Sequence, residues 1–293
     1  SQWLDPETIT ARQLHQAAGV LRHAAQTIPF YRARFQEAGF DPHAPLTPAH
    51  WLHLPILSRA DVQIAGPKLL SPSIPKQHGN INWTQTSGST GQPVRVANTA
   101  LVNHFWSVFT LREHQWHQRN LQGKLATIRV IKGGAPPPRG LSAASWGQAT
   151  HGLYQTGSSV ALDIGASVTD QITWLQRENP DYLLTYPSNL HALTSHCLQH
   201  GITFPKLKDV RTVGEIVTPA MRQACQEAWG VPLIDTYSSQ EFGYIALQCP
   251  EHGHMHIQAE NVLVEILDAH NQPCAPGETG RLVSHADYAT AIL

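Results

Sequence analysis

Residues 171–241 alternate between short apolar runs and amphipathic segments, and this alternation constrains the fold more strongly than any other feature of the chain. Three short, mostly apolar runs are typical of buried strands: Tyr182–Tyr186, Val210–Val213 and Val231–Asp235. Capping residues and breakers predict the helices between and before them, over Gln171–Asn179, from Ser188 to Gly201 and from Thr218 to Gly230. The resulting β-α-β-α-β order predicts an α/β fold with a parallel sheet and right-handed crossovers.

Polar or glycine-bearing segments follow each of these predicted strands directly. They are Tyr186-Pro187-Ser188, Gly214-Glu215-Ile216 and Tyr237-Ser238-Ser239-Gln240-Glu241. In open α/β sheets, ligands bind outside the carboxyl ends of the strands. We therefore expect the three segments to meet along one ligand-binding crevice.

A second candidate site is the run Thr86-Ser87-Gly88-Ser89-Thr90-Gly91-Gln92-Pro93. Backbone N–H groups and hydroxyls in such a loop can surround an anion, and glycine allows a phosphate to come close. The run differs from the G-x-x-x-x-G-K-[ST] nucleotide loop because no Lys-Ser or Lys-Thr follows the second glycine. The alternative is a solvated linker, but extended segments at Ile81–Thr84 and Val94–Val96 favour a tight hairpin-like connection.

The remaining N-terminal half is less regular. A helix is predicted over Thr10–Thr27 and ended by Pro29-Phe30-Tyr31, and a short helix is predicted near Ser58. The aromatic segment 103–109 should pack its apolar face inward.

Composition excludes several classes of function. Only 14% of the 293 residues are charged and the net charge is −1, so there is no electrostatic footprint for nucleic acid. No apolar run is long enough to cross a bilayer, and the four cysteines are too scattered for a disulfide scaffold. These features predict a soluble cytoplasmic enzyme or small-molecule binder without a nucleic-acid or membrane partner.

Taken together, the motifs resemble those of the adenylate-forming superfamily of acyl-CoA ligases and adenylation domains. Thr86–Pro93 is similar to its phosphate loop, Gly214-Glu215 to its adenine loop, and Asp235–Glu241 to its Asp/Asn-x-Tyr-Gly-x-Thr-Glu motif. Four segments resemble the phenylacetate–CoA ligase-like branch: Ile28-Pro29-Phe30-Tyr31-Arg32, Tyr186-Pro187-Ser188, Cys249-Pro250-Glu251-His252-Gly253 and Gly277-Glu278-Thr279-Gly280-Arg281-Leu282.

The resemblance implies that ATP and a carboxylic acid form an acyl-adenylate, whose acyl group passes to a thiol, most often that of coenzyme A. By the same resemblance, residues 1–293 form the large N-terminal adenylation domain, with mixed and parallel sheets flanked by helices and a smaller β-rich C-terminal portion. The small C-terminal lid domain, with its lysine, is expected to be absent, so the chain alone should be poorly active.

The resemblance also assigns roles to individual residues. Glu241 would hold Mg²⁺ between its carboxylate and the phosphates, with Gln240 beside it in the motif, and Tyr237 would stack on adenine. The nucleotide-binding set comprises Thr86, Ser87, Gly88, Ser89, Thr90, Gly91, Gly214, Glu215, Ile216, Asp235, Tyr237, Ser238 and Ser239. Candidates for the acyl pocket are Phe105, Trp106, Tyr186 and Ser188, whose aromatic members favour a flat or aryl acid, although aromatic residues also fill cores.

Departures from the motif keep two alternatives open. Ser238 stands where the family has glycine, and Gln240 where it has threonine. One alternative is an adenylating enzyme that loads a carrier protein instead of coenzyme A. The other is a nucleotide-binding scaffold that has lost catalysis.

A histidine-rich segment suggests a structural zinc site. Cys249 and His252 have the spacing of a metal knuckle, and His254 and His256 would share one face of a following strand. A hairpin through Val262–Leu267 could bring Cys274 near. The alternative is a histidine-rich loop in a chain that contains 18 histidines.

Overall fold

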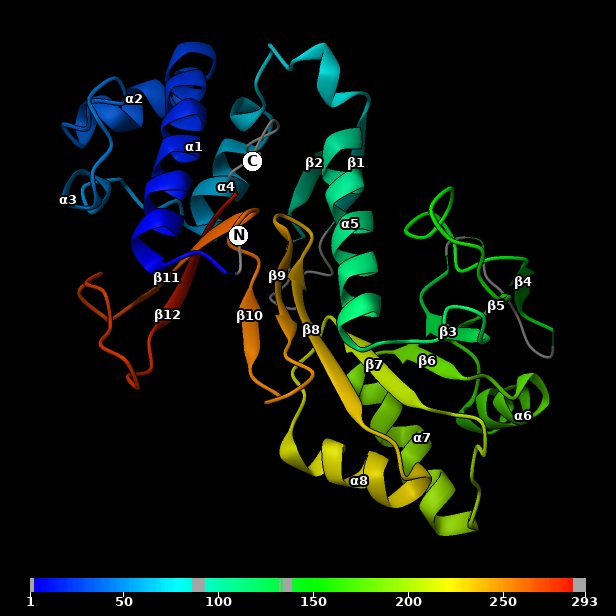
Figure 1. The fold of residues 1–293 in the computed structure, drawn as a ribbon. Helices are drawn as coiled ribbons and strands as arrows, with labels where there is room; N and C mark the ends of the chain where they lie inside the picture. The colour runs from blue at the N-terminus through cyan, green and yellow to red at the C-terminus, as the bar shows by residue number, and fades with distance from the viewer. Residues whose placement is uncertain (1–2, 86–92, 132, 134–138, 287–293) are drawn as a thin grey trace. The chain divides into compact units, whose positions relative to one another are not determined.

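The computed structural model describes residues 3–85, 93–131, 133 and 139–286, which form two compact units (Figure 1). The first unit comprises residues 1–106, 239–245 and 257–293, and the second comprises residues 107–238 and 246–256. Among the described residues, no helix has the length and apolar character needed to cross a membrane.

An eight-stranded sheet runs through the second unit. Its order is β10 (Met255–Ile257), β9 (Gly243–Gln248), β8 (Leu233–Ser239), β7 (Asp209–Val213), β6 (Tyr182–Thr185), β3 (Leu125–Arg129), β5 (Ser159–Asp163) and β4 (Leu141–Ala143). Strands β8, β7, β6, β3 and β5 are parallel, and β4 pairs antiparallel with β5 at one edge. The predicted α/β class and parallel sheet are confirmed.

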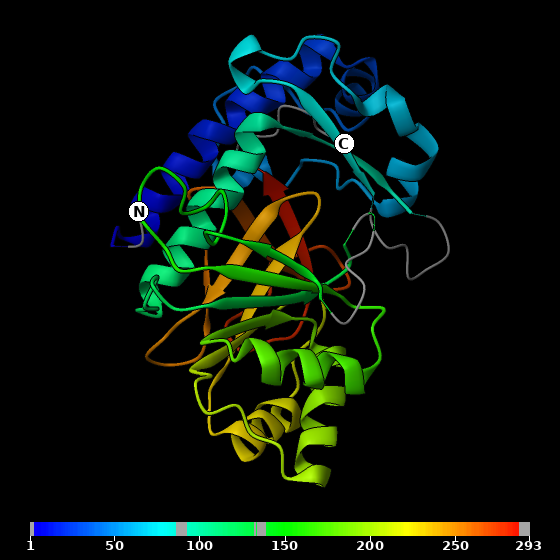
Figure 2. The same ribbon diagram turned by 90° about the vertical axis from the view of Figure 1, so that its right-hand side faces the viewer.

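Three crossover helices cover one face of this sheet (Figure 2): α6 (Val168–Glu178), α7 (Pro187–His200) and α8 (Pro219–Trp229). The chain steps from β5 through β6 and β7 to β8 in one direction across the sheet, and right-handed crossovers in one direction place their helices on the same face. The helices and the strands enclose the main apolar core, in which Leu190, Leu193 and Val210 are fully buried.

Capping explains most of the helix boundaries. Thr218 caps α8 as predicted, with Pro219 in the first turn, and Gly230 ends the helix in the left-handed conformation. The prediction that Ser188 caps α7 is wrong, since Tyr186 is the N-cap residue and Pro187 begins the helix. Proline fixes φ at a helical value and lacks the N–H that the first turn leaves unpaired, so the helix starts one residue earlier than expected.

The opposite face of the sheet carries a buried cluster of charges. Side chains alternate along a strand, so Asp209 and Arg211 of β7 face away from the core that Val210 enters. Glu113 of α5 (Ala100–Trp116) is fully buried and forms ion pairs with Arg119 at 2.8 Å and Arg211 at 3.0 Å. Arg119 also pairs with Asp209 at 2.9 Å. Burial raises the pKa of the Glu113 carboxyl, but the nearby positive charges outweigh it and hold the pKa at about 2.

His114 should make the unfolding free energy depend on pH. Its Nδ1 lies 3.1 Å from a guanidinium nitrogen of Arg119, and burial lowers the pKa of His114 to about 3. Below the ordinary histidine pKa, the unfolded chain therefore binds a proton that the folded chain does not. Stability should fall as the pH drops from about 7 to about 5, with a contribution approaching about 1.4 kcal/mol per pH unit.

Urea unfolding of the protein and of His114→Gln across this pH range measures the effect. We expect a shallower loss of stability in the variant because glutamine does not titrate. Equal slopes for the two proteins would show that His114 protonates as readily in the folded state as in the unfolded state.

The first unit consists of short helices and two small sheets. Its helical elements are α1 (Pro6–Thr27), α2 (Pro29–Glu37), α3 (Pro48–Trp51), α4 (Arg59–Ala65) and the 3₁₀ turns η1 (Gly66–Leu69) and η2 (Lys76–His78). Its two-stranded sheets pair β1 (Ile81–Gln85) with β2 (Arg95–Thr99), and β11 (Val262–Leu267) with β12 (Arg281–Ala286), both antiparallel. Tyr31 and Phe35 of α2 pack with Ile28 in an apolar cluster.

Several predictions for the first unit can be compared with these elements. The helix near Ser58 is confirmed as α4, which Ser58 and Asp61 close with a reciprocal capping box. The first helix ends at Thr27, just before Pro29, as predicted. Pro29 also begins α2, a helix that the sequence analysis did not predict, because proline suits a first helical turn. The two extended segments pair as predicted, yet residues 86–94 join them, so the connection is longer than a tight hairpin turn.

Candidate functional site

The ends of β6 and β7 in the second unit lie side by side. In the strand register Thr185 pairs with Thr212, so Tyr186 and Gly214 follow at the same edge of the sheet. A Cβ atom on Gly214 would lie 3.7 Å from two ring carbons of Tyr186. The prediction that these two segments meet is confirmed.

The third segment also lies at this edge, although the predicted end of its strand is wrong. Val213 pairs with Thr236, which places Tyr237 one residue further toward the same edge. Strand β8 continues to Ser239, so Tyr237 and Ser238 lie within the strand and not after it. The side chain of Tyr237 is 44% exposed, which leaves its ring accessible for stacking.

Glu215 connects the loop after β7 to the start of α7. Its carboxylate accepts hydrogen bonds from the backbone N–H of Ser188 at 2.8 Å and from the Ser188 hydroxyl at 3.0 Å. A carboxylate at this position satisfies an unpaired N–H of the first helical turn and interacts favourably with the helix dipole. Ser188 is thus a partner of Glu215 and not the cap of its own helix. Ile216, next in the loop, is 86% exposed.

Gly214 holds the loop in a conformation that other residues resist. Its φ is +82°, and a Cβ atom there would meet only an ordinary contact with Tyr186. Backbone strain without a clash should therefore make Gly214→Ala lose about 1–2 kcal/mol of unfolding free energy.

The matched control for Gly214→Ala is Gly19→Ala. Gly19 lies inside α1, and apart from the adjoining residues and backbone of that helix no described atom lies within 4 Å of the place that an alanine Cβ would take. Alanine there should stabilise the protein by up to about 1 kcal/mol. Urea unfolding of both variants should show changes of opposite sign. Equal behaviour of the two would contradict the strain assigned to Gly214.

Asp235 is fixed by the strands around it. Its Oδ1 accepts hydrogen bonds from the Thr212 hydroxyl at 3.2 Å and the Thr236 N–H at 2.9 Å, and its own N–H donates to the side chain of Gln248. Burial raises the pKa of the Asp235 carboxyl, and the two hydrogen bonds to Oδ1 act in the opposite direction. Sequence reasoning missed Thr212 and Gln248, because their contacts follow from strand register.

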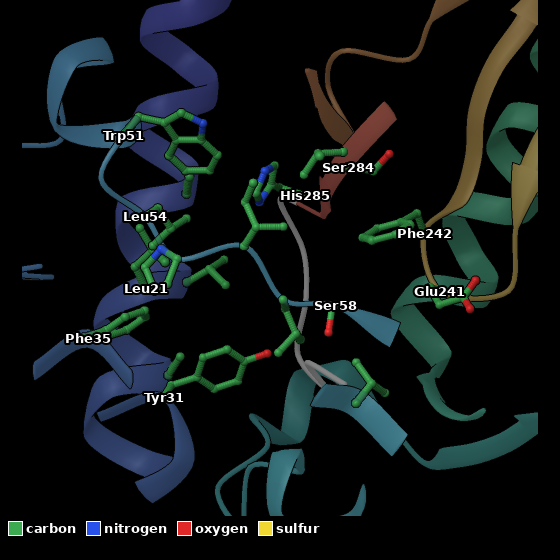
Figure 3. A pocket seen from close by; sticks show the side chains of 18 of the residues that line it. Leu21, Tyr31, Phe35, Trp51, Leu54, Ser58, Glu241, Phe242, Ser284 and His285 are labelled. Atoms are coloured by element: carbon green, nitrogen blue, oxygen red, sulfur yellow. The ribbon is translucent and has the colours of Figure 1, made fainter. Parts of the chain in front are cut away.

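Glu241 belongs to the first unit, where it borders a cavity of about 330 Å³. Figure 3 shows Glu241 and Phe242 on a loop at one side of this pocket, opposite Leu21 and Tyr31 on the helical side, with the Glu241 carboxylate turned away from them. Val94, which follows the serine- and glycine-rich loop, also lines the pocket. The residues directly after that loop and the Glu241 turn therefore lie close together within one unit.

The lining of this pocket limits what it can hold. Most of its surface comes from aliphatic and aromatic side chains, among them Phe35, Trp51 and Leu54. The Tyr31 hydroxyl, whose pKa burial raises, points into it beside Ser58 (Figure 3). Such a lining suits an apolar group and not a triphosphate. The sequence analysis singled out Tyr31 in a family-like segment without assigning it to a pocket, and no motif indicated Phe242, because apolar side chains on different elements carry no spacing pattern.

Trp106 packs against the strand that follows Glu241. Its ring centroid lies 4.7 Å from that of Tyr244, and a Cβ atom on Gly243 would be 3.5 Å from its indole nitrogen. Neither Trp106 nor Phe105 is among the residues lining the 330 Å³ cavity. Ser239 accepts a hydrogen bond from the Phe242 N–H at 3.1 Å, so its hydroxyl braces the turn that carries Gln240 and Glu241.

The predicted site residues thus divide between the two units. Those in the second unit are Tyr186, Ser188, Gly214, Glu215, Ile216, Asp235, Tyr237 and Ser238, and those in the first unit are Phe105, Trp106, Ser239, Gln240 and Glu241. The loop residues Thr86, Ser87, Gly88, Ser89, Thr90 and Gly91 lie outside the described residues. The predicted proximity of Ser89 and Glu241 stays a prediction.

The cysteine–histidine segment folds into a compact cluster in the second unit. Ligand atoms of Cys249, His252 and His254 all lie within 4.8 Å of one another. The backbone N–H of His252 is the main cause that lowers the pKa of the Cys249 thiol to about 6. Cys274 belongs to the first unit, so the hairpin through Val262–Leu267 does not make it part of this compact group.

Comparison with known proteins identifies the family. The AMP-binding enzyme family matches residues 8–290. The phenylacetate–coenzyme A ligase of Aromatoleum evansii is 25% identical over 284 residues, which cover 94% of this chain and 62% of that protein. The corresponding ligase of Thermus thermophilus is 23% identical over 96% of this chain and 62% of its own length. The chain therefore spans about 62% of the length of these relatives.

Solved structures show the same fold. A 2-hydroxyisobutyryl-CoA ligase in complex with 2-HIB-AMP and CoA, in its thioesterification state, superimposes with a TM-score of 0.77 at 20% identity. That match covers 99% of this chain and 62% of the ligase. An anthranilate CoA ligase with bound anthranoyl-AMP matches with a TM-score of 0.53 at 17% identity, over 74% of this chain and 40% of its own. The chain belongs to the family of AMP-binding enzymes.

Proposed function

We propose that the protein activates a carboxylic acid with ATP and transfers the acyl group to coenzyme A. In the first step, a carboxylate oxygen attacks the α-phosphorus of ATP, forming the acyl-adenylate and releasing pyrophosphate. In the second step, the thiol sulfur attacks the acyl carbon, AMP leaves, and the thiol proton passes to solvent. The chain covers 62% of the length of the Aromatoleum evansii ligase, so this activity is proposed for the whole protein.

The observation that carries the proposal is the common sheet edge reached by Tyr186, Gly214 and Tyr237. This edge is where open α/β sheets bind their ligands. The exposed Tyr237 ring offers a face to a purine, and the loop fixed between Glu215 and Ser188 would line the same pocket. Asp235 would accept a hydrogen bond from the exocyclic amine of adenine, because its Oδ1 is already oriented by Thr212 and Thr236.

Glu241 fits a role as ligand of Mg²⁺. A carboxylate oxygen is a preferred ligand of that ion, which bridges carboxylates and substrate phosphates in many nucleotide enzymes. Glu241 is partly exposed on the turn that Ser239 braces, so its side chain is accessible and its backbone is held. When bound, Mg²⁺ would neutralise the phosphate charge that a carboxylate nucleophile must approach.

The acid is proposed to be flat and aromatic. The support is the position of Trp106, which packs on Gly243 and Tyr244 next to the Glu241 turn, and of Tyr186 at the sheet edge. Aromatic side chains offer large, rigid apolar surfaces on which an aryl ring can stack.

Acid-dependent exchange of labelled pyrophosphate into ATP tests the first step. The assay uses the full-length protein with phenylacetate, benzoate, acetate and butyrate, each with and without Mg²⁺. Exchange with the aromatic acids supports adenylation of an aromatic acid, while exchange with only the aliphatic acids keeps adenylation and overturns the aromatic assignment. ATP binding without exchange for any acid would favour the scaffold that has lost catalysis.

The thiol acceptor is tested separately by following AMP release. Release that depends on coenzyme A, with formation of an acyl-CoA product, supports the proposed second step. Adenylation that stops at the acyl-adenylate with coenzyme A, but continues with a phosphopantetheine-bearing carrier protein, would assign the enzyme to carrier loading.

A further inference from the structure

The cysteine–histidine cluster lies at the edge of the eight-stranded sheet. Cys249 follows β9 and His254 precedes β10, the edge strand. Two backbone hydrogen bonds close the turn between them, from the Cys249 N–H to His254 at 2.7 Å and from the Gly253 N–H to Cys249 at 3.1 Å. These backbone hydrogen bonds therefore hold the Cα positions of the turn, and no metal ion is needed for this.

Three of the side chains converge at distances that a metal ion could close. The Cys249 Sγ lies 3.8 Å from Nδ1 of His252, and the His254 ligand atom is within 4.8 Å of both. Around a tetrahedral zinc ion, with Zn–N about 2.0 Å and Zn–S about 2.3 Å, neighbouring ligand atoms are roughly 3.3–3.7 Å apart. The cluster needs only small side-chain rotations to reach that spacing, and both histidines are exposed, so solvent leaves room for such rotations.

A fourth ligand is available from the neighbouring strand position. His254 directly precedes β10 and His256 lies within it, and the centroids of their rings are 4.6 Å apart. The His256 side chain also interacts with the Cys249 thiol, and its ring forms a T-shaped pair with that of Trp116 at a centroid distance of 5.5 Å. His256 thus lies beside the group of three, although it is outside their 4.8 Å limit.

We propose that Cys249, His252, His254 and His256 bind one structural Zn²⁺ ion. A thiolate with three imidazoles suits zinc and not Mg²⁺ or Ca²⁺, which prefer oxygen ligands. Four protein ligands leave no open position, so the ion would hold the edge hairpin together and take no part in chemistry. This inference is independent of the proposed ligase activity, because no residue of the cluster belongs to the proposed nucleotide set.

Metal content and cobalt spectroscopy on the full chain test the proposal. Protein purified without a histidine tag and dialysed should retain near-stoichiometric zinc by mass spectrometry. Replacement of zinc by Co²⁺ should give a thiolate-to-cobalt charge-transfer band and the intense visible bands of tetrahedral cobalt. Cys249→Ser should abolish the charge-transfer band, and His254→Ala should weaken zinc binding by at least about 100-fold.

Two matched variants control for adventitious binding. His196 and His200 lie one helical turn apart on α7 with their ring centroids 4.3 Å apart, so this pair could bind an adventitious metal ion. Cys274 is the most accessible of the four cysteines. His196→Ala and Cys274→Ser should leave zinc content and the cobalt spectrum unchanged, and circular dichroism should show that all four variants are folded.

Three outcomes would overturn the proposal. The first is purified protein that neither retains zinc nor takes up one equivalent of added zinc or cobalt. The second is a cobalt spectrum without a thiolate band, and the third is metal binding that His196→Ala abolishes while His254→Ala does not. A structural role also requires that removal of zinc by a chelator lowers the thermal unfolding temperature of the parent protein and leaves that of Cys249→Ser unchanged.

Discussion

Replacement of Glu113 by alanine is expected to lower the unfolding free energy by about 3–5 kcal/mol. Glu113 is fully buried and pairs with Arg119 at 2.8 Å and with Arg211 at 3.0 Å. Its removal would take an ionic partner from each of two buried guanidinium groups, and the remaining carboxylate, Asp209, forms its ion pair with Arg119. Uncompensated charge in a low-dielectric interior is costly, and typical domains are stable by only about 5–15 kcal/mol.

Urea unfolding at neutral pH, followed by circular dichroism, measures this effect. The control is Lys208→Ala in the same unit, which removes an ion pair with Asp181 at 2.9 Å whose lysine is half exposed. Solvent screens such a pair, so the control should lose no more than about 1 kcal/mol. A loss for Glu113→Ala as small as that of Lys208→Ala would mean that water or relaxation compensates the two arginines.

The charge cluster could not be predicted from the sequence. Glu113 and Arg211 are nearly one hundred positions apart, and neither stands in a recognisable motif. The sequence predicted only that the aromatic segment 103–109 packs its apolar face inward, whereas the last turns of α5 bury the Glu113 carboxylate against Arg211 of β7. Only the strand order, which places β7 near the centre of the sheet, explains why charges there must pair with one another.

Helix ends and strands could be predicted where neighbouring residues in the sequence determine them. Thr218-Pro219 and Gly230 define α8, and the alternation of apolar runs predicted the parallel strands. Ser188 misled for a physical reason: a serine near a helix start resembles a cap, but Pro187 before it already occupies the first turn. The hydroxyl is then left to bind Glu215, which belongs to a different loop.

Only the part of the candidate site that lies in recognisable sequence motifs could be predicted. The segments after β6, β7 and Asp235 follow from the pattern of an α/β sheet, and their shared edge is confirmed by the register. The pocket lined by Tyr31, Phe242 and Val94 could not be predicted from the sequence, because it forms where elements distant in sequence pack together. A motif appears where binding or catalysis requires particular residue types, whereas the apolar lining of a pocket can be formed by many different residues.

Replacement of Glu241 by glutamine is expected to lower acid-dependent pyrophosphate exchange by at least about 100-fold in the full-length protein. Glutamine keeps the size and the hydrogen-bonding reach of glutamate but loses the negative charge that would hold Mg²⁺ at the phosphates. The side chain is partly exposed on a braced turn, so the variant should unfold at the same temperature as the parent. We therefore expect the Glu241 substitution to lower activity without lowering stability, whereas the Glu113 substitution should lower stability.

The magnesium dependence distinguishes a metal ligand from a residue that only shapes the site. If Glu241 holds the ion, the variant should need a higher Mg²⁺ concentration for half-maximal exchange, because a neutral amide binds the ion more weakly. The control is Glu37→Gln at the exposed end of α2, which should leave both the rate and the Mg²⁺ requirement unchanged. Exchange by Glu241→Gln that falls with an unaltered Mg²⁺ requirement would assign Glu241 to positioning of the substrate, and unchanged exchange would remove it from the site.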